Sequence, residues 1–415
     1  MELTKPLNER TQQLRALAPV LFLSIIFSLI MLGIFWDRVS SLDLWDDDDY
    51  MRLVQISGWV TSGNWYLQPL ERLNPQDGQI IHWSRVPDIL PYVLIKILSA
   101  VTDSETATLV SISITPLIYL CVTVVCISAV TNKLFGAQYA FVSAAYALSS
   151  YLLVKFLPGS IDHHNVQLFI TALFILLIPN TEQGFKDEKK AWTQGMLAAL
   201  SLWVGVANIL FFITALTVLV LYGIFKREVS LKYASTISLS AFILSLLFIL
   251  LNRPYSEFFD IHIDAISIPF SFCFLSGFIF CRTYIKLSNK LHLKPLLILV
   301  CSIISLSPTL IIFPQLLTDF AYSGYPEVLR FYWLDLVSET FSTLHYINKE
   351  GFFSSSNIIL MFAPAILAIL AIDKKKPYST STLYSYFHLL YHFSGRLEHP
   401  WCRYCWLYHY KHSLP

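Results

Sequence analysis

Long apolar runs separated by short polar segments dominate this chain. A helix needs about 20 mostly apolar residues to cross the hydrocarbon core of a bilayer. The runs that reach or approach this length predict about ten transmembrane helices, at residues 16–36, 107–130, 137–157, 164–180, 192–208, 209–225, 232–251, 264–281, 295–314 and 355–372. The pattern therefore predicts an all-α polytopic membrane protein with one transmembrane domain over residues 1–372.

Two stretches of this pattern leave alternatives open. The runs 192–208 and 209–225 follow one another without a polar loop, so they form either two helices or one long tilted helix. The run 89–101 begins just after Pro87 and Asp88 and is too short to span the bilayer. A helix that lies at the membrane interface is the favoured interpretation for this run.

The distribution of lysine and arginine decides between these alternatives. Positive charges in short loops are more frequent on the cytoplasmic side of a membrane. The basic residues before the first run place the N-terminus in the cytoplasm, and every lysine-rich loop joins them if 89–101 does not cross and 192–225 crosses twice. The outer face then receives segments 37–106, 158–163, 252–263 and 315–354. Long loops are common places for a functional site, and the first external loop, 37–106, is the longest.

Composition supports the membrane assignment and excludes other classes. The chain is 55% hydrophobic and only 14% charged, whereas soluble domains carry about a quarter charged residues. The net charge of +1 gives no indication of a nucleic-acid partner. The seven cysteines are scattered and suggest no disulfide framework.

Four consecutive aspartates, residues 46–49 in "WDDDDYMR", follow the first apolar run. The segment after them has helical spacing and a helix here would end at Gly63. One interpretation is an acidic first turn that the helix dipole stabilises, which applies best to the first two aspartates. Asp48 and Asp49 adjoin the helix body next to Arg52, and we expect them to face a site.

A second polar group, "LPGSIDHHNVQLF", precedes the fourth predicted span. Asp162 and His164 place a carboxylate and an imidazole two residues apart, which fits one cation or a hydrogen-bonded acid–base pair. Histidines are also common at membrane interfaces without any further role. Because the group lies at the same membrane level as the aspartate run, a functional role is favoured.

Basic and aromatic residues lie between these two groups in "ERLNPQDGQIIHWSRVPDILPY". Arg72, His82 and Arg85 are candidate anion binders, and a guanidinium can hold phosphate oxygens with two donors. They are otherwise ordinary charges of a solvated loop. One membrane face thus collects residues suited to a phosphate-linked lipid, with a metal to neutralise the phosphate or a carboxylate to deprotonate an acceptor hydroxyl.

Residues 15–180 resemble the membrane glycosyltransferases of the GT-C superfamily. The resemblance rests on the acidic pair of "DDYMR", the interfacial "PDILPYVLIKIL", the short loop "TNKLFG" and the "DHH" motif. It implies a GT-C-like fold and the transfer of a sugar from a polyprenyl-(di)phosphate donor to a lipid or envelope-glycan acceptor. By the same likeness, the protein lies in the bacterial inner membrane with its site on the outer face.

The resemblance also implies roles for individual residues. "DHH" is similar to the second acidic motif of oligosaccharyltransferase catalytic subunits, which implies Asp162 and His164 as ligands of a divalent metal, Mg or Mn. It also implies that one of the four aspartates 46–49 is the first-loop carboxylate, with Asp49 the candidate for a third ligand. The acidic pair resembles that of arabinose and mannose transferases, which implies Asp48 or Asp49 as base or ligand. Arg52 is then expected near the donor phosphate, together with Arg72, His82 and Arg85.

Two departures from the oligosaccharyltransferase pattern narrow the expected reaction. The "WWD" acceptor motif is missing, with only a faint echo in "FYWLDLVSE", and no soluble C-terminal domain follows. Transfer of one sugar to a lipid or envelope glycan is therefore expected rather than transfer to protein asparagine. In the segment 315–354, Arg330 is a further candidate phosphate binder, although an amphipathic interfacial helix explains the segment equally well.

Two other functions are compatible with a polytopic membrane protein of this kind. A transporter or flippase for a lipid-linked glycan would place charges within the spans or show inverted repeats, and a non-catalytic membrane protein needs neither.

Residues 373–415 are atypical, with abundant Tyr, His and Trp after Lys376. A frameshift or truncation explains this tail better than a zinc site formed by Cys402, Cys405, His409 and His412.

Overall fold

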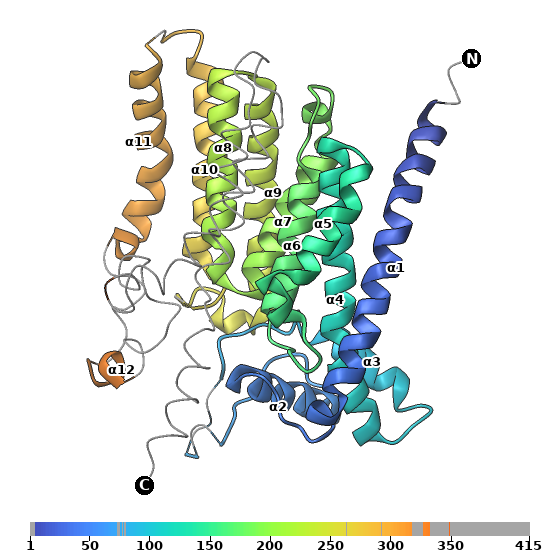
Figure 1. The fold of residues 1–415 in the computed structure, drawn as a ribbon. Coiled ribbons are helices and arrows are strands. Elements are labelled where there is room, and N and C mark those ends of the chain that lie inside the picture. The colour runs from blue at the N-terminus through green and yellow to red at the C-terminus, as the bar shows by residue number, and fades with distance from the viewer. Residues whose placement is uncertain are drawn as a thin grey trace. The chain divides into compact units, whose positions relative to one another are not determined.

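The computed structural model describes a helical protein (Figure 1). It describes residues 5–72, 75, 76, 78, 80–262, 264–291, 293–317, 327–332 and 348. Among these residues every regular element is a helix, as the apolar pattern predicts. The chain divides into two compact units, of which the first holds residues 5–178, Met196–Val206 and Leu244–Ser267, within the described part.

The first unit is built from helices that belong to the first half of the chain. They are α1 (Lys5–Ser40), α2 (Asp47–Ser62), α3 (Ile89–Leu98), α4 (Ser104–Phe135), α5 (Gln138–Ser149) and α6 (His164–Leu177), with a 3-10 helix at Tyr151–Phe156. The last residues of α7 (Glu188–Val204) and α9 (Val229–Asn252) also belong to this unit. Small side chains allow α1 to approach α4 closely, since Ser24 and Ser28 are buried and Ser28 lies 3.4 Å from Cys121.

A second apolar cluster lies under the long first loop. Val39, Leu44, Ile56, Ile95 and Ile161 belong to it, and they come from the end of α1, from the link between α1 and α2, from α2 and α3, and from the segment before α6. The cluster therefore packs the loop helices onto the chain segment that carries the "DHH" motif. Burial of such side chains is the main favourable term in placing these segments.

Aromatic side chains connect the same loop to the end of α9. Trp59 stacks on Tyr92 with a centroid distance of 3.9 Å, which joins α2 to α3. The Trp65 indole donates a hydrogen bond of 2.6 Å to the Leu251 carbonyl, and Trp203 of α7 donates one of 3.0 Å to Asn252 Oδ1. The first loop and the end of α7 are thus both held against the last residues of α9 within this unit.

The second unit contains the other helices that the structure describes. These are α8 (Ile209–Phe225), the beginnings of α7 and α9, α10 (Ile268–Leu287), α11 (Lys294–Ile312) and the short α12 (Glu327–Tyr332). Buried polar contacts join its helices: the Tyr233 hydroxyl lies 2.5 Å from Gln194 Oε1, and the Ser276 and Thr309 hydroxyls lie 2.7 Å apart. Such interhelical hydrogen bonds satisfy polar groups in an apolar environment.

The predicted spans agree with the structure in part. Six described helices are long and apolar enough to cross a membrane: Arg15–Ser40, Ser104–Phe135, Val206–Phe225, Val229–Asn252, Ile268–Leu287 and Lys294–Ile312. They indicate an integral membrane protein, but the count of ten spans is not confirmed. The predicted spans at 137–157, 164–180 and 192–208 correspond to helices of 12, 14 and 17 residues. The predicted span at 355–372 and the tail 373–415 lie outside the described residues.

The two open alternatives are resolved at the level of helices. Within 192–225 the chain forms two helices, α7 and α8, separated by Gly205 and a 3-10 helix at Val206–Asn208. The run 89–101 forms the 10-residue α3, which is too short to span a bilayer. Short helices in the long first loop were predicted, and α2 and α3 confirm them.

Gly159 generates a prediction about how the first loop is held. Its φ is +87°, and an added Cβ would lie 3.1 Å from Val39 Cγ2 and 3.3 Å from Leu44 Cδ2. We expect Gly159→Ala to lower the free energy of unfolding by about 1–3 kcal/mol, because backbone strain and crowding add. The matched control is Gly58→Ala on the exposed face of α2, which meets nothing within 4 Å and should stabilise by about 0.5–1 kcal/mol.

Thermal unfolding of both purified variants in a mild detergent, followed by circular dichroism, measures this difference. A Gly159→Ala protein that melts at or above the wild-type temperature would show that the contacts of Gly159 with Val39 and Leu44 do not constrain the loop.

Candidate functional site

The aspartate run forms the first turn of α2. Asp46 has extended backbone angles, φ −144° and ψ 154°, and its side chain accepts a hydrogen bond from the Asp48 N–H at 3.3 Å, so it caps the helix. Asp47, Asp48 and Asp49 then occupy the first turn, where the helix dipole favours negative charge. Gly63 ends α2 with a φ of 72°, as predicted. The capping interpretation thus holds for Asp46.

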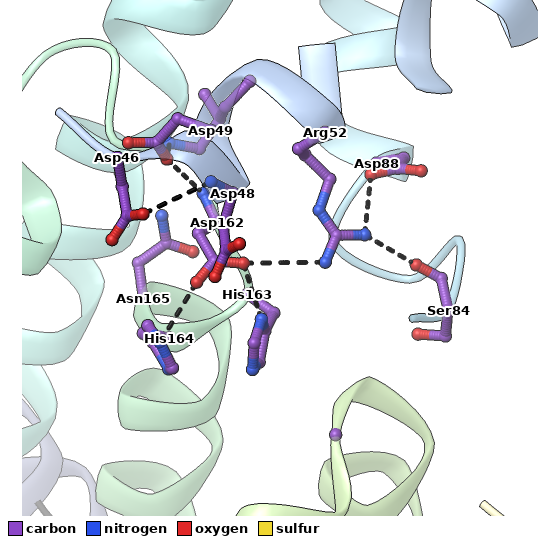
Figure 2. Close-up of polar contacts among 12 residues, drawn as sticks. Asp46, Asp48, Asp49, Arg52, Ser84, Asp88, Asp162, His163, His164 and Asn165 are labelled. Carbon is purple, nitrogen blue, oxygen red and sulfur yellow. Dashed lines mark hydrogen bonds and ion pairs between the residues drawn. The ribbon is translucent and has the colours of Figure 1, made fainter. Parts of the chain in front are cut away.

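Asp49 joins this first turn to the chain before α6. Its Oδ1 accepts hydrogen bonds from the backbone N–H groups of Ile161, at 2.8 Å, and Asp162, at 2.9 Å. The Asp49 side chain is fully buried, whereas Asp48 is half-buried and Asp47 is exposed. The two polar groups that the sequence places more than one hundred residues apart therefore meet at one place (Figure 2).

Asp162 is the centre of this meeting point. Its Oδ1 accepts a hydrogen bond from His163 Nδ1 at 2.6 Å, and its Oδ2 lies 3.0 Å from His164 Nε2. One potential ligand atom from each of Asp162, His163 and His164 lies within 4.8 Å of the others. This donor set is of the kind that holds a divalent cation, and His163 joins the two members that the sequence analysis predicted.

Arg52 lies beside Asp162 and is completely buried. Its Nη1 donates to the Ser84 carbonyl at 3.0 Å and to Asp88 Oδ1 at 3.2 Å, and its guanidinium carbon lies 4.5 Å from the centre of the Trp83 ring. Its Nη2 lies 3.7 Å from Asp162 Oδ1. Neither Nε nor Nη2 makes a hydrogen bond to any residue that the structure describes. Figure 2 shows the guanidinium between Asp162 and Asp88.

Arg85 is buried as well, but its donors are engaged by the protein. Nη1 donates to the Gln55 carbonyl at 2.9 Å and to Asp88 Oδ2 at 3.3 Å, and Nε donates to the Trp65 carbonyl at 3.1 Å. Arg85 therefore holds Asp88 and the first loop in place. Sequence reasoning noted Asp88 only as the start of α3, although the Arg-x-x-Asp spacing of residues 85–88 was the available signal.

The other predicted substrate-binding residues lie apart from this cluster of buried groups. Arg72 is exposed. His82 is partly exposed, and its Nδ1 lies 3.8 Å from Asp264 Oδ2, a partner that sequence reasoning missed. Arg330 belongs to α12, and its side chain lies outside the part of the chain that the structure describes.

Burial and charge divide the site's carboxyl groups into two states. Burial raises the pKa of Asp49 to about 8, and the negative charge of Asp162 adds to this effect. Burial would also raise the pKa of Asp162, but His163, His164 and Arg52 hold that pKa well below its usual range. At neutral pH, Asp162 is therefore the ionised carboxylate of the pair, and Asp49 carries a proton.

This chain is similar to known proteins in its three-dimensional structure, and its sequence matches none of them. No protein-family model matches the sequence, and no curated protein matches it. The structure is similar to the Archaeoglobus fulgidus oligosaccharyltransferase crystallised with Zn and sulfate, with 14% identity and a TM-score of 0.50 over 90% of this chain and 48% of the other. The archaeal oligosaccharyltransferase AglB from the same organism, in complex with an inhibitory peptide and a dolichol-phosphate, gives 14% identity and a TM-score of 0.52 over 92% and 46%.

These similarities concern the fold. The chain spans about half the length of the oligosaccharyltransferase chains it matches, and its identity to them is low. The shared fold agrees with the resemblance to the GT-C superfamily that the motifs of residues 15–180 suggested, and it distinguishes no subfamily.

The two hydrogen bonds of Asp49 generate a prediction about stability. In the metal-free protein, Asp49→Ala should lower the free energy of unfolding by about 2–4 kcal/mol, because two buried N–H groups lose their acceptor. Asp49→Asn keeps an oxygen at that position and should unfold close to the wild type near pH 4, where the carboxyl is largely protonated in the unfolded state as well.

The pH dependence has a definite sign. Because the pKa of Asp49 rises from 3.8 to about 8 on folding, the folded state favours the protonated carboxyl. Stability that is present below pH 4 is therefore lost progressively as the pH rises through 8. We expect the wild type to lose stability relative to Asp49→Asn between pH 5 and pH 9, measured by thermal unfolding with a chelator present. Parallel melting curves over this range would contradict the prediction.

Proposed function

We propose that this protein is a membrane glycosyltransferase that transfers a sugar from a polyprenyl-phosphate or -diphosphate donor. The acceptor is a lipid or an envelope glycan, and the site faces the outer side of the bacterial inner membrane. One observation carries the proposal: a carboxylate–histidine cluster suited to a cation lies next to a buried arginine with two uncommitted donors. A phosphate needs partners of both kinds.

The ligands of similar structures support this substrate class. One Archaeoglobus oligosaccharyltransferase structure holds Zn and sulfate, and another holds a dolichol-phosphate. A sulfate has the shape of a phosphate group, and a dolichol-phosphate is a polyprenyl phosphate. The same chemistry fits the cluster around Asp162 in the present chain.

The proposed metal ligands are Asp162 and His164, together with Asp49, which would release its proton when the cation binds. Their carboxylate and imidazole atoms suit a divalent cation such as Mg or Mn, and Asp49 reaches the cluster through the backbone of residues 161 and 162. When bound, the cation would neutralise phosphate oxygens and make the phosphate a better leaving group. Asp48, the half-buried neighbour of Asp49, is a further carboxylate proposed for the catalytic site.

Arg52 is the proposed phosphate-binding residue of the interior. Asp88 and the Ser84 carbonyl hold one end of its guanidinium, and the Trp83 ring covers one face. Nε and Nη2 remain, and Nη2 points toward Asp162. Two such donors fit two phosphate oxygens, and burial strengthens the interaction because water does not screen it. Arg85 acts through Asp88 as a positioning residue.

Arg72, His82 and Arg330 remain proposed substrate contacts. The exposed Arg72 is available to a headgroup that enters from the solvent side of the first loop. The role proposed for Arg330 as a phosphate binder rests on the sequence alone.

The location of the buried charges favours an enzyme over a transporter or flippase. Asp49, Arg52, Arg85, Asp88, Asp162 and His164 are the buried acidic and basic side chains of the described residues, and all of them lie outside the six candidate spans. A transport path would place charged groups within the spans. A non-catalytic membrane protein would have no need of the costly buried charges.

Transfer by reconstituted protein tests the proposal. Full-length protein in liposomes is given a panel of polyprenyl-phosphate and -diphosphate sugars with a lipid or glycan acceptor, and products are measured by mass spectrometry. We expect Asp162→Asn and His164→Ala to insert normally and to lose transfer by about 100-fold or more, since each removes a ligand. The control is Glu182→Gln, which breaks an exposed ion pair with Arg227 in the second unit.

Full transfer by both variants would reject the assigned ligands. Movement of the labelled lipid across the bilayer without transfer would support the flippase alternative, and the same vesicles report both events.

Arg52→Lys gives a separate prediction about the phosphate. A lysine keeps the charge but offers a single point charge in place of the planar fork, so donor affinity should fall by about 10- to 100-fold. Binding of Mn²⁺ in the absence of lipid, measured by electron paramagnetic resonance, should stay within about twofold, because Arg52 is no metal ligand. Unchanged binding of polyprenyl phosphate would contradict the role given to Arg52.

A further inference from the structure

His82 and Asp264 form a half-exposed pair at the edge of the site. His82 belongs to the first loop and Asp264 to the segment after α9, and both lie in the first unit. Nδ1 of His82 is 3.8 Å from Oδ2 of Asp264, and their side chains are 46% and 40% exposed. The exposure sets this pair apart from the buried charges around Asp162.

The Trp83 ring lies between this pair and the buried cluster around Asp162. The His82 ring is 5.6 Å from the Trp83 ring, whose other neighbours are the Arg52 guanidinium at 4.5 Å and the His163 ring at 6.2 Å. The Ser267 hydroxyl donates a hydrogen bond of 2.7 Å to the His262 carbonyl, which holds the segment that carries Asp264. Trp83 therefore contacts His82 on one side and the residues of the buried cluster on the other.

The buried carboxyl groups are unsuited to accept a proton from a substrate. Asp49 is fully buried, and its Oδ1 already accepts hydrogen bonds from the Ile161 and Asp162 N–H groups. Both oxygens of Asp162 are engaged, one by His163 and the other by His164. A hydroxyl that attacks a sugar must nevertheless lose its proton, and an imidazole titrates in the range suited to this task.

The geometry points to His82 as the proton acceptor and to Asp264 as the residue that positions it. A carboxylate beside Nδ1 favours the tautomer with its proton on Nδ1, which leaves the Nε2 lone pair available. The inference rests on the proposed function and deepens it, because it assigns the acceptor a hydroxyl group. The partial exposure of His82 leaves room for a hydroxyl-bearing acceptor to approach from the solvent side.

In the proposed step, the acceptor hydroxyl displaces the polyprenyl phosphate from the sugar. The acceptor oxygen forms a bond to the anomeric carbon of the sugar while the bond from that carbon to the phosphate oxygen breaks. The polyprenyl phosphate leaves with the bonding electrons, and the hydroxyl proton passes to Nε2 of His82. Asp264 stabilises the imidazolium that results.

Four charged groups act on His82, and they give the test its signs. Partial burial lowers the pKa of His82, and the charges of Arg52 and Arg253 add to this, whereas Asp264 and Asp162 act against it. His82 works as a base only above its own pKa. Removing the charge of Asp264 should therefore move the acid limb of the rate profile to lower pH, and removing that of Arg253 should move it to higher pH.

The experiment measures kcat/KM from pH 5 to pH 9 in proteoliposomes, with the polyprenyl-linked donor that the wild type uses. We expect His82→Gln to lower kcat/KM by about 100-fold or more and to flatten the acid limb. Asp264→Asn and Arg253→Gln should shift the limb in opposite directions. Binding of polyprenyl phosphate, followed by native mass spectrometry, should stay within about twofold in His82→Gln, and Glu182→Gln is the control for activity.

Three results would overturn the inference. His82→Gln with an unchanged acid limb would show that another group accepts the proton. A parallel loss of polyprenyl-phosphate binding would make His82 a phosphate contact. A wild type that transfers no sugar from any donor would reject the proposed function and this inference with it, whereas an active wild type with an unaffected His82→Gln rejects the inference alone. Asp264→Asn keeps the test valid if His82→Gln does not fold.

Discussion

The hydrogen bonds from the backbone of residues 161 and 162 to the Asp49 carboxyl are the constraint on which the rest of the site depends. They fix the start of α2 against the start of α6 in a fully buried position. An N–H group that lost its acceptor there would cost about 1–3 kcal/mol, so the two segments are held in one register. Through that register Arg52, one turn along α2, lies beside Asp162.

The surrounding charges keep this geometry rigid. Arg52 and Arg85 share Asp88, and backbone carbonyls take further donors of both guanidinium groups. Buried charges are tolerated only when such partners compensate for lost hydration. The donors of Arg52 that stay uncommitted are therefore oriented before any ligand arrives, and a bound phosphate would pay little for ordering them.

The limits of many helices could be predicted from the sequence, but the side-chain contacts between segments distant in the chain could not. The limits of α2 and the short α3 follow from capping residues, Gly63 and apolar run length, and the break within 192–225 from the distribution of lysines. Hydropathy overestimated other helices because it does not register where helices end: α6 stops at Leu177, just before Ile178 and Pro179. The meeting of Asp49 with residue 162 was expected from a shared membrane face, but the pairings of Asp88 and of Asp264 depend on loop paths that no periodicity encodes.

The chain of Arg52, Asp88 and Arg85 has an evolutionary consequence. Loss of Asp88 would leave two buried cations facing each other, and loss of either arginine would upset the charge balance that the other two share. Single substitutions in this triad are thus disfavoured even where the reaction does not require the residue. Descendants of this gene should inherit the three residues as a block or replace them together by apolar side chains, and a lineage of the second kind would also have abandoned the anionic substrate proposed above.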